Sequence, residues 1–177
     1  MDLIQKIKIL HNNLAVKNYK KVIEGSSKIL RTNPNNAYVL NLTGMAYQGL
    51  MQHKIAIKCF HDALAKEPKN IAAMNNLANS YKAIGKLEFA EKLYKQLLVL
   101  NPNYLNALNN FANLKFLINK YSEGIEFLKK AILIIEKNPE KNPKQLTQIL
   151  FTLASAYQSI GDTEETKKVI NKILLTD

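Results

Sequence analysis

The 177-residue sequence predicts an all-α solenoid of stacked helix pairs, and three observations carry this prediction. In residues 70–102, apolar side chains recur at spacings of three and four, which is typical of two amphipathic helices. Gly85 separates the two patterns and predicts a turn between them. Pro34, Pro68 and Pro102 recur at one fixed interval, and a constant period of this length indicates repeated helix pairs.

Small and aromatic residues hold fixed places inside the period. Counting from Ala37, the series is Gly44, Tyr47, Ala56, Phe60, Ala63 and Pro68. Counting from Ile71, the series is Ala78, Tyr81, Ala90, Tyr94, Leu97 and Pro102. Small residues let helices cross closely, and aromatic rings fill the space beside them. The pattern resembles the tetratricopeptide repeat (TPR), and the resemblance implies a right-handed α-solenoid of about five helix–turn–helix repeats in a single domain, residues 1–177.

The repeats are expected at residues 3–36, 37–70, 71–104, 105–146 and 147–177. Repeat one should contain a first helix from Leu3 to Ala15 and a second helix that begins near Tyr19. Gly25 and Ser26 stand where the TPR pattern has aromatic residues, so we expect this repeat to pack with less bulk. Repeats two and three follow the pattern most regularly.

Repeat four departs from the pattern, because Lys115 replaces an aromatic residue and Gly124 replaces an alanine. It is also longer than repeats two and three, by an insertion of eight positions. The segment from Asn138 to Pro143 has two prolines and no apolar residue, which predicts a loop. We expect the inserted residues to lengthen both helices that flank this loop.

Repeat five should end in a helix from Glu164 to Leu175 that carries five apolar side chains: Val169, Ile170, Ile173, Leu174 and Leu175. Solenoids usually end in a capping helix with a polar outer face, and none follows here. We therefore expect a longer natural protein, or self-association through the uncapped C-terminal helix.

The formal charge of +11 comes from 25 Lys and Arg residues against 14 Asp and Glu residues. Only Arg31 is an arginine, whereas proteins that read nucleic acids rely on arginine for bidentate contacts. The composition thus favours a solvated lysine-rich surface or an acidic partner over nucleic acid. No secretory signal and no apolar run of ~20 residues is visible, so we expect a cytoplasmic protein that does not enter a membrane.

Catalytic and metal-binding patterns are absent from the sequence. His11, His53 and His61 are not spaced as metal ligands, and the single cysteine, Cys59, can form neither an intramolecular disulfide nor a thiolate zinc site. There is no glycine-rich phosphate loop, no nucleophile elbow and no acid pair in an apolar setting. The sequence predicts a non-enzymatic protein without a cofactor or a metal.

The resemblance implies that the first helix of each pair lines a concave groove. The predicted peptide-binding residues on these helices are Tyr38, Asn41, Asn75, Asn76, Asn79, Asn106, Asn109, Asn110, Asn113, Phe116 and Phe151. Carboxamides offer a donor and an acceptor, so they can pair with the backbone of an extended peptide. Because Asn costs roughly 0.6 kcal/mol relative to Ala inside a helix, changing Asn76, Asn79, Asn110 and Asn113 to Ala is expected to stabilise the fold. A compositional bias toward Asn, Lys and Ile is the alternative explanation for these residues.

Two TPR variants can be compared with this groove. The clamp that TPR cochaperones use for acidic chaperone tails needs cations, and the corresponding positions hold Asn41, Met45, Asn76, Asn106 and Asn110. The asparagine ladder of the O-linked N-acetylglucosamine transferase TPR region is more similar, through Asn76 and Asn110, although Leu42 and Thr152 interrupt it.

The sequence therefore predicts a protein-interaction module that binds an extended peptide or partner segment. The alternatives are the N-terminal substrate-recruiting arm of a longer transferase, such as a glycosyltransferase or sulfotransferase, and nucleic-acid binding through the lysines.

Overall fold

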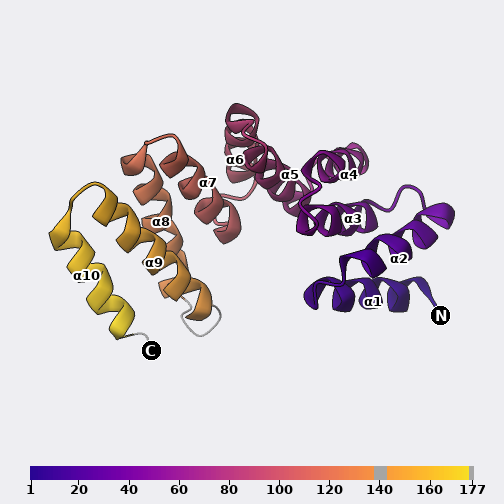
Figure 1. Cartoon of the computed structure of the whole chain (residues 1–177), viewed down its shortest axis with the longest axis horizontal. Coiled ribbons are helices and arrows are strands. Elements are labelled where there is room, and N and C mark those ends of the chain that lie inside the picture. The colour runs from indigo at the N-terminus through magenta and orange to yellow at the C-terminus, as the bar shows by residue number, and fades with distance from the viewer. Residues whose placement is uncertain (138–142, 176–177) are drawn as a thin grey trace. The chain divides into compact units, whose positions relative to one another are not determined.

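The computed structural model describes residues 1–137 and 143–175, which form ten α-helices and no strand (Figure 1). The helices are α1 (Leu3–Ala15), α2 (Tyr19–Thr32), α3 (Ala37–Gly49), α4 (His53–Lys66), α5 (Ile71–Ala83), α6 (Leu87–Leu100), α7 (Leu105–Leu117), α8 (Tyr121–Glu136), α9 (Pro143–Ser159) and α10 (Thr163–Leu174). Each odd-numbered helix packs against the next even-numbered helix, so the predicted solenoid of five helix pairs is confirmed. The loop predicted at 138–143 lies outside the described residues except for Pro143, which begins α9.

The turns inside the five helix pairs share one backbone conformation. A residue with positive φ follows each first helix: Lys17, Met51, Gly85, Asn119 and Gly161. The next residue donates its backbone N–H to a carbonyl five positions earlier, as Gln52 does to Tyr47 at 2.9 Å. This bond closes the helix end in a Schellman motif. The interval between these residues is constant as far as Asn119, and the last step is longer, as expected from the predicted insertion.

The insertion lengthens both helices around it, as predicted. Helix α8 has 16 residues, whereas α2, α4 and α6 have 14. Helix α9 has 17 residues, one helical turn more than the 13 of α3, α5 and α7.

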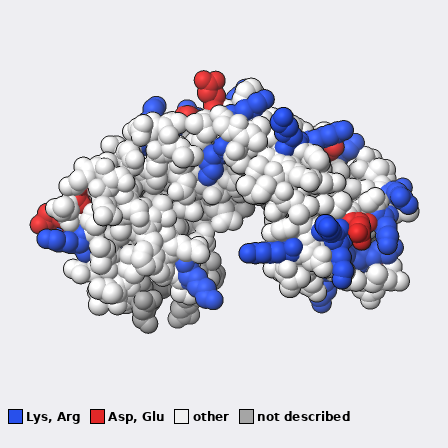
Figure 2. All heavy atoms as spheres, viewed as in Figure 1, with Lys and Arg blue, Asp and Glu red and all other residues white. Residues whose placement is uncertain are grey.

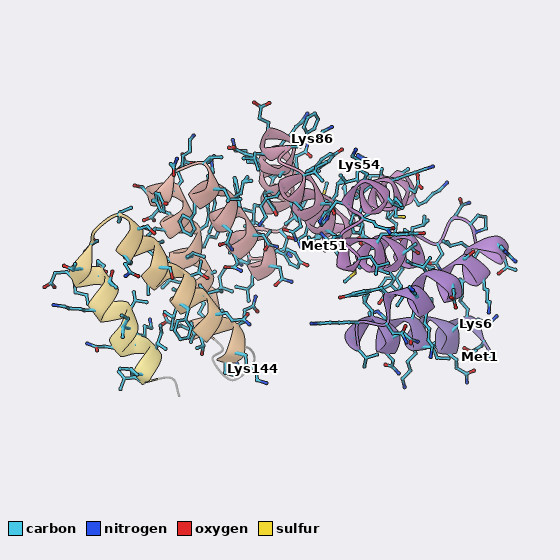
Figure 3. The ribbon with its side chains drawn as sticks, viewed as in Figure 1. Met1, Lys6, Met51, Lys54, Lys86 and Lys144 are labelled. Atoms are coloured by element: carbon cyan, nitrogen blue, oxygen red, sulfur yellow. The ribbon has the colours of Figure 1, made fainter. Side chains whose placement is uncertain are left out.

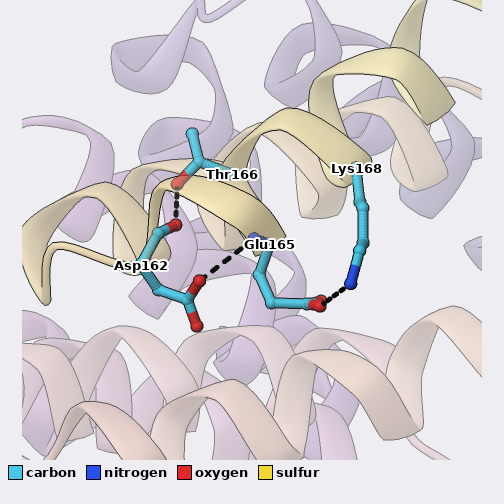
Figure 4. Close-up of polar contacts among 4 residues, drawn as sticks. All are labelled: Asp162, Glu165, Thr166 and Lys168. Carbon is cyan, nitrogen blue, oxygen red and sulfur yellow. Dashed lines mark hydrogen bonds and ion pairs between the residues drawn. The ribbon is translucent and has the colours of Figure 1, made fainter.

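Short polar side chains determine where several helices begin. The side chains of Asn36 and Asn70 accept hydrogen bonds from the backbone N–H groups of Val39 and Ala73, both at 3.0 Å. Asp162 does the same for Glu165 at the start of α10 (Figure 4). These side chains satisfy donors that the first turn of a helix leaves unpaired. Because Asp162 is the N-cap residue, α10 begins at Thr163, one residue before the predicted start.

The chain divides into two compact units, unit 1 (Met1–Leu100, α1–α6) and unit 2 (Asn101–Asp177, α7–α10). The single domain predicted over residues 1–177 stays a prediction. In unit 1, α1 lies beside α3 and α3 lies beside α5, so the first helices of three repeats are neighbours. The core beneath them contains two buried clusters, Leu10–Ile29–Val39–Leu42 and Ala56–Phe60–Leu77.

Repeat one has small side chains at Gly25 and Ser26, the positions where the TPR pattern has aromatic residues. A Cβ atom on Gly25 would lie 2.6 Å from Leu10 Cδ2, so the Leu10 side chain fills the space that a larger residue would take. Ser26 is fully buried beside it, and its hydroxyl has no hydrogen-bond partner among the described residues.

In unit 2, the lysine that replaces an aromatic residue is buried. Lys115 is 2% exposed, and its ammonium group lies 2.5 Å from Glu123 Oε2 and 5.1 Å from the centre of the Phe111 ring. Gly124, the other departure in repeat four, makes room for the Phe116 ring, which stacks on Tyr121. The Lys115 hydrogen bond is the main cause that lowers the pKa of the Glu123 carboxyl.

We expect this ion pair to make unit 2 sensitive to acid. A carboxyl with a lowered pKa in the folded state adds stability above its ordinary pKa, and this stability is lost as the pH falls through the lowered value. Glu123→Gln should therefore weaken the fold near neutral pH and flatten the pH dependence of unfolding at acidic pH, measured by urea titration across a pH series. Glu126→Gln is the matched control, because Glu126 pairs with Lys129 only at an exposed i, i+3 site. Equal pH profiles for the wild type and Glu123→Gln would contradict the expectation.

Candidate functional site

The predicted binding residues of unit 1 include one that makes an aromatic contact between α1 and α3. The predicted residue Tyr38 lies against His11, with the ring centres 5.5 Å apart and a hydrogen bond between His11 Nε2 and the Tyr38 hydroxyl. Tyr38 keeps 41% of its surface exposed. The sequence analysis assigned no binding role to His11, although the residue occupies a predicted groove position of repeat one. The two residues occupy different positions in different repeats, so their spacing in the sequence could not reveal the contact.

Carboxamides join α3 to α5 next to this contact. Asn76 Nδ2 donates to Asn41 Oδ1 at 3.1 Å. Gln48 Nε2 lies within reach of two oxygens on α5, the Asn76 carbonyl at 3.4 Å and Ser80 Oγ at 3.2 Å. Asn41 is only 5% exposed and Asn75 6%, whereas Asn76 is half-buried. The structure thus brings predicted site residues together, but it uses part of their bonding capacity between helices.

Asn79 has a structural partner. The Tyr94 hydroxyl of α6 donates to Asn79 Oδ1 at 2.6 Å, and the Tyr94 side chain is fully buried. Burial raises the pKa of the Tyr94 hydroxyl, which keeps it protonated as a donor. The expectation that alanine at this position stabilises the fold therefore needs correction, because it would remove the acceptor of a buried hydroxyl.

Unit 2 carries its own set of predicted residues on α7 and α9. Asn106 accepts a hydrogen bond from Gln145 Nε2 at 3.1 Å, which links α7 to α9. Asn113 Nδ2 donates to the Asn109 carbonyl at 3.0 Å, and the side-chain oxygen of Asn109 is buried without a partner in the described part of the chain. Asn110 is half-buried and makes contacts of its own.

The two predicted aromatic residues of unit 2 differ in exposure. Phe151 on α9 is 58% exposed, so much of its ring surface is accessible to a partner. Phe116 packs against Gly124 and Tyr121, so at least part of its ring surface serves the fold.

Two further titratable side chains of unit 1, Lys82 and Cys59, have pKa values shifted by burial. Lys82 is the one cation of α5, and burial lowers the pKa of its amine. Burial is also the main cause that raises the pKa of the Cys59 thiol, and a protonated thiol is a poor nucleophile.

Residues 1–137 and 143–175 contain no group of three His, Cys, Asp or Glu side chains that could hold a metal ion. Among the helices described, none has the length and apolar character needed to cross a bilayer.

Two segments of the chain match family models of the tetratricopeptide repeat, residues 73–108 and residues 147–177. The first match covers most of α5, all of α6 and the start of α7, and the second covers most of α9 and all of α10. The first match lies mostly in unit 1, and the second lies in unit 2. A comparison with curated protein sequences gave no match.

Solved structures with this fold cover almost the whole chain. BtubC (BKLC) from P. vanneervenii is 16% identical with a TM-score of 0.86, over 98% of this chain and 79% of that one. TTC0263, a thermophilic TPR protein in Thermus thermophilus, is 20% identical with a TM-score of 0.79, over 97% of this chain and 90% of that one. MamA from Desulfovibrio magneticus RS-1 is 16% identical with a TM-score of 0.77, over 97% of this chain and 93% of that one. At these identities the likeness establishes the fold alone.

Proposed function

We propose that this protein is a non-catalytic protein-interaction module, and that unit 1 binds an extended peptide or partner segment across α1, α3 and α5. The observation that supports this most directly is the row of partly exposed polar and aromatic side chains on three adjacent helices. Tyr38 and His11 connect α3 to α1, and Gln48 and Asn76 connect α3 to α5. Hydrogen bonds already hold these side chains in place, so binding would order few of them, which lowers its entropic cost.

The test is a selection of binding peptides from a random displayed library with the full chain as bait. We expect the selected peptides to bind a Tyr38→Ala/Asn76→Ala variant roughly tenfold more weakly or worse. Each lost hydrogen bond contributes about 0.5–1.5 kcal/mol, and two such losses together approach or exceed the roughly 1.4 kcal/mol that corresponds to a factor of ten. The affinities would be measured by isothermal titration calorimetry. Asn79 is left unchanged, because of its bond to Tyr94.

Phe89→Ala is the matched control, because Phe89 is an aromatic residue with 56% exposure on α6, a second helix of a pair. The proposal requires that this variant bind the selected peptides as the wild type does. Equal losses in both variants, or unchanged affinity in Tyr38→Ala/Asn76→Ala, would contradict binding across α1, α3 and α5.

The transferase arm remains a second candidate, supported by the partial asparagine ladder. Asn76 and Asn110 occupy equivalent positions in successive repeats, and both are half-buried. A recruiting arm would use the same groove, so the peptide selection applies to both candidates. The coding sequence that adjoins this chain distinguishes them, because only a transferase arm requires a catalytic domain in the same polypeptide.

A further inference from the structure

A cavity of about 400 Å³ lies between α1 and α2, away from the groove-facing residues. Ile9, Leu10 and Ile29 provide apolar walls, and Lys6, Lys21 and Lys28 stand among the lining residues. Met1 and Lys6 lie together at the N-terminal end of α1 (Figure 3). The volume is within the range of ligand pockets, which combine apolar walls with a few polar groups.

This cavity uses a different face of α1 from the groove. Lys6, Ile9 and Asn13 recur at intervals of three and four, so they share one side of the helix, and His11 falls on the opposite side. The proposed groove and the cavity can therefore be occupied independently.

In the next repeat, a helix covers the equivalent face. The residue of α3 that corresponds to Ile9 is Thr43, which is 9% exposed because α2 packs over it, with Ile23 and Leu30 nearby. Ile9 itself is 45% exposed. The geometry of the solenoid thus favours a helix as the element that would cover α1.

The charge around the cavity favours an acidic occupant. None of Lys6, Lys21 and Lys28 forms an ion pair within the described residues, and Glu24 is the only carboxylate in the lining. Unit 1 as a whole has a formal charge of +9, because residues 1–100 carry fifteen Lys or Arg and six Asp or Glu. Figure 2 shows several blue side chains over α1 and α2, with one red group among them.

We propose that this cavity is a second docking site, which takes an acidic amphipathic helix of a partner protein. Apolar side chains of the helix enter the cavity, and its carboxylates pair with the three lysines. A second copy of this chain fits the site poorly. Its exposed apolar helix, α10, carries Ile170 and Leu174, but three lysines on that helix outnumber its two glutamates and would meet the lysines of the cavity.

The probe is a fluorescein-labelled synthetic peptide with Leu at helical spacings of three and four and Glu at most other positions. We expect saturable binding to the full chain by fluorescence anisotropy, and weaker binding of a peptide with the same composition in scrambled order. Lys6→Glu/Lys28→Glu and, separately, Ile9→Gln should each weaken binding by roughly tenfold or more, since loss of about 1.4 kcal/mol is a factor of ten. All three side chains are exposed or line the open cavity, and circular dichroism would confirm that the variants fold.

Lys17→Glu/Lys20→Glu is the matched control, because it makes the same change in charge on residues outside the cavity. The proposal requires near wild-type binding in this variant. Equal losses in both lysine variants would show unspecific attraction, and equal binding of the scrambled peptide or no saturable binding would also overturn the proposal. Light scattering completes the test: a wild-type oligomer that Ile9→Gln dissociates would identify a second copy as the occupant and exclude an acidic partner.

Discussion

Gly44→Ala is expected to lower the free energy of unfolding by about 1–3 kcal/mol, which is the usual cost of overpacking a core. A Cβ atom at this position would lie 2.7 Å from Cδ1 of Phe60, inside the van der Waals distance. The Phe60 ring is fully buried between α3, α4 and α5, so it has little room to move. Urea denaturation of the purified variant measures the change.

A second background makes this prediction specific. Alanine favours a helix over glycine by about 1 kcal/mol, so Gly44→Ala should stabilise a Phe60→Leu protein, in which the ring is gone. The equivalent positions of the next repeat hold Ala78 and Tyr94, which are both fully buried, so that repeat accommodates alanine at this position. A Gly44→Ala protein as stable as the wild type would mean that Phe60 can shift at low cost.

Asn79→Ala should destabilise the fold by about 1–3 kcal/mol, because the buried Tyr94 hydroxyl loses its acceptor. The better helix propensity of alanine, roughly 0.6 kcal/mol, offsets only part of this loss. In a Tyr94→Phe background no hydroxyl remains to be satisfied, and the same Asn79→Ala change should then stabilise the protein slightly. Thermal or urea unfolding of the four proteins in this double-mutant cycle gives the coupling energy.

Asn76→Ala provides the comparison for that cycle. Asn76 is half-buried and is hydrogen-bonded to Asn41, which is buried. Tyr94→Phe should not alter the effect of Asn76→Ala, since the two residues share no hydrogen bond. If Asn79→Ala has the same effect in both backgrounds, the Tyr94 hydroxyl gains no stability from Asn79, and this result would favour a role for Asn79 in peptide binding.

The period, the helix pairs and their turns could be predicted from the sequence because they depend on neighbours in the chain. Apolar spacing of three and four determines a helix, and the second residue after each first helix takes positive φ in every repeat. The longer repeat was predictable for the same reason, since counting from one turn to the next shows the extra residues. The sequence also predicted that Tyr38, Asn41 and Asn76 lie on the first helices of adjacent repeats, and the structure places them on α3 and α5.

Only the tertiary structure decided which of these side chains form hydrogen bonds to other helices. Asn76 and Asn79 stand in the same helix, three positions apart, but one meets a carboxamide of α3 and the other a buried hydroxyl of α6. Lys115 stands at a position for an aromatic ring and is buried against Glu123 and Phe111. The cavity beside Ile9 exists because no helix covers that face of α1 within the described residues. These outcomes depend on distances between helices that are remote in sequence, and the repeat pattern alone specifies which helices meet, not which side chains bond.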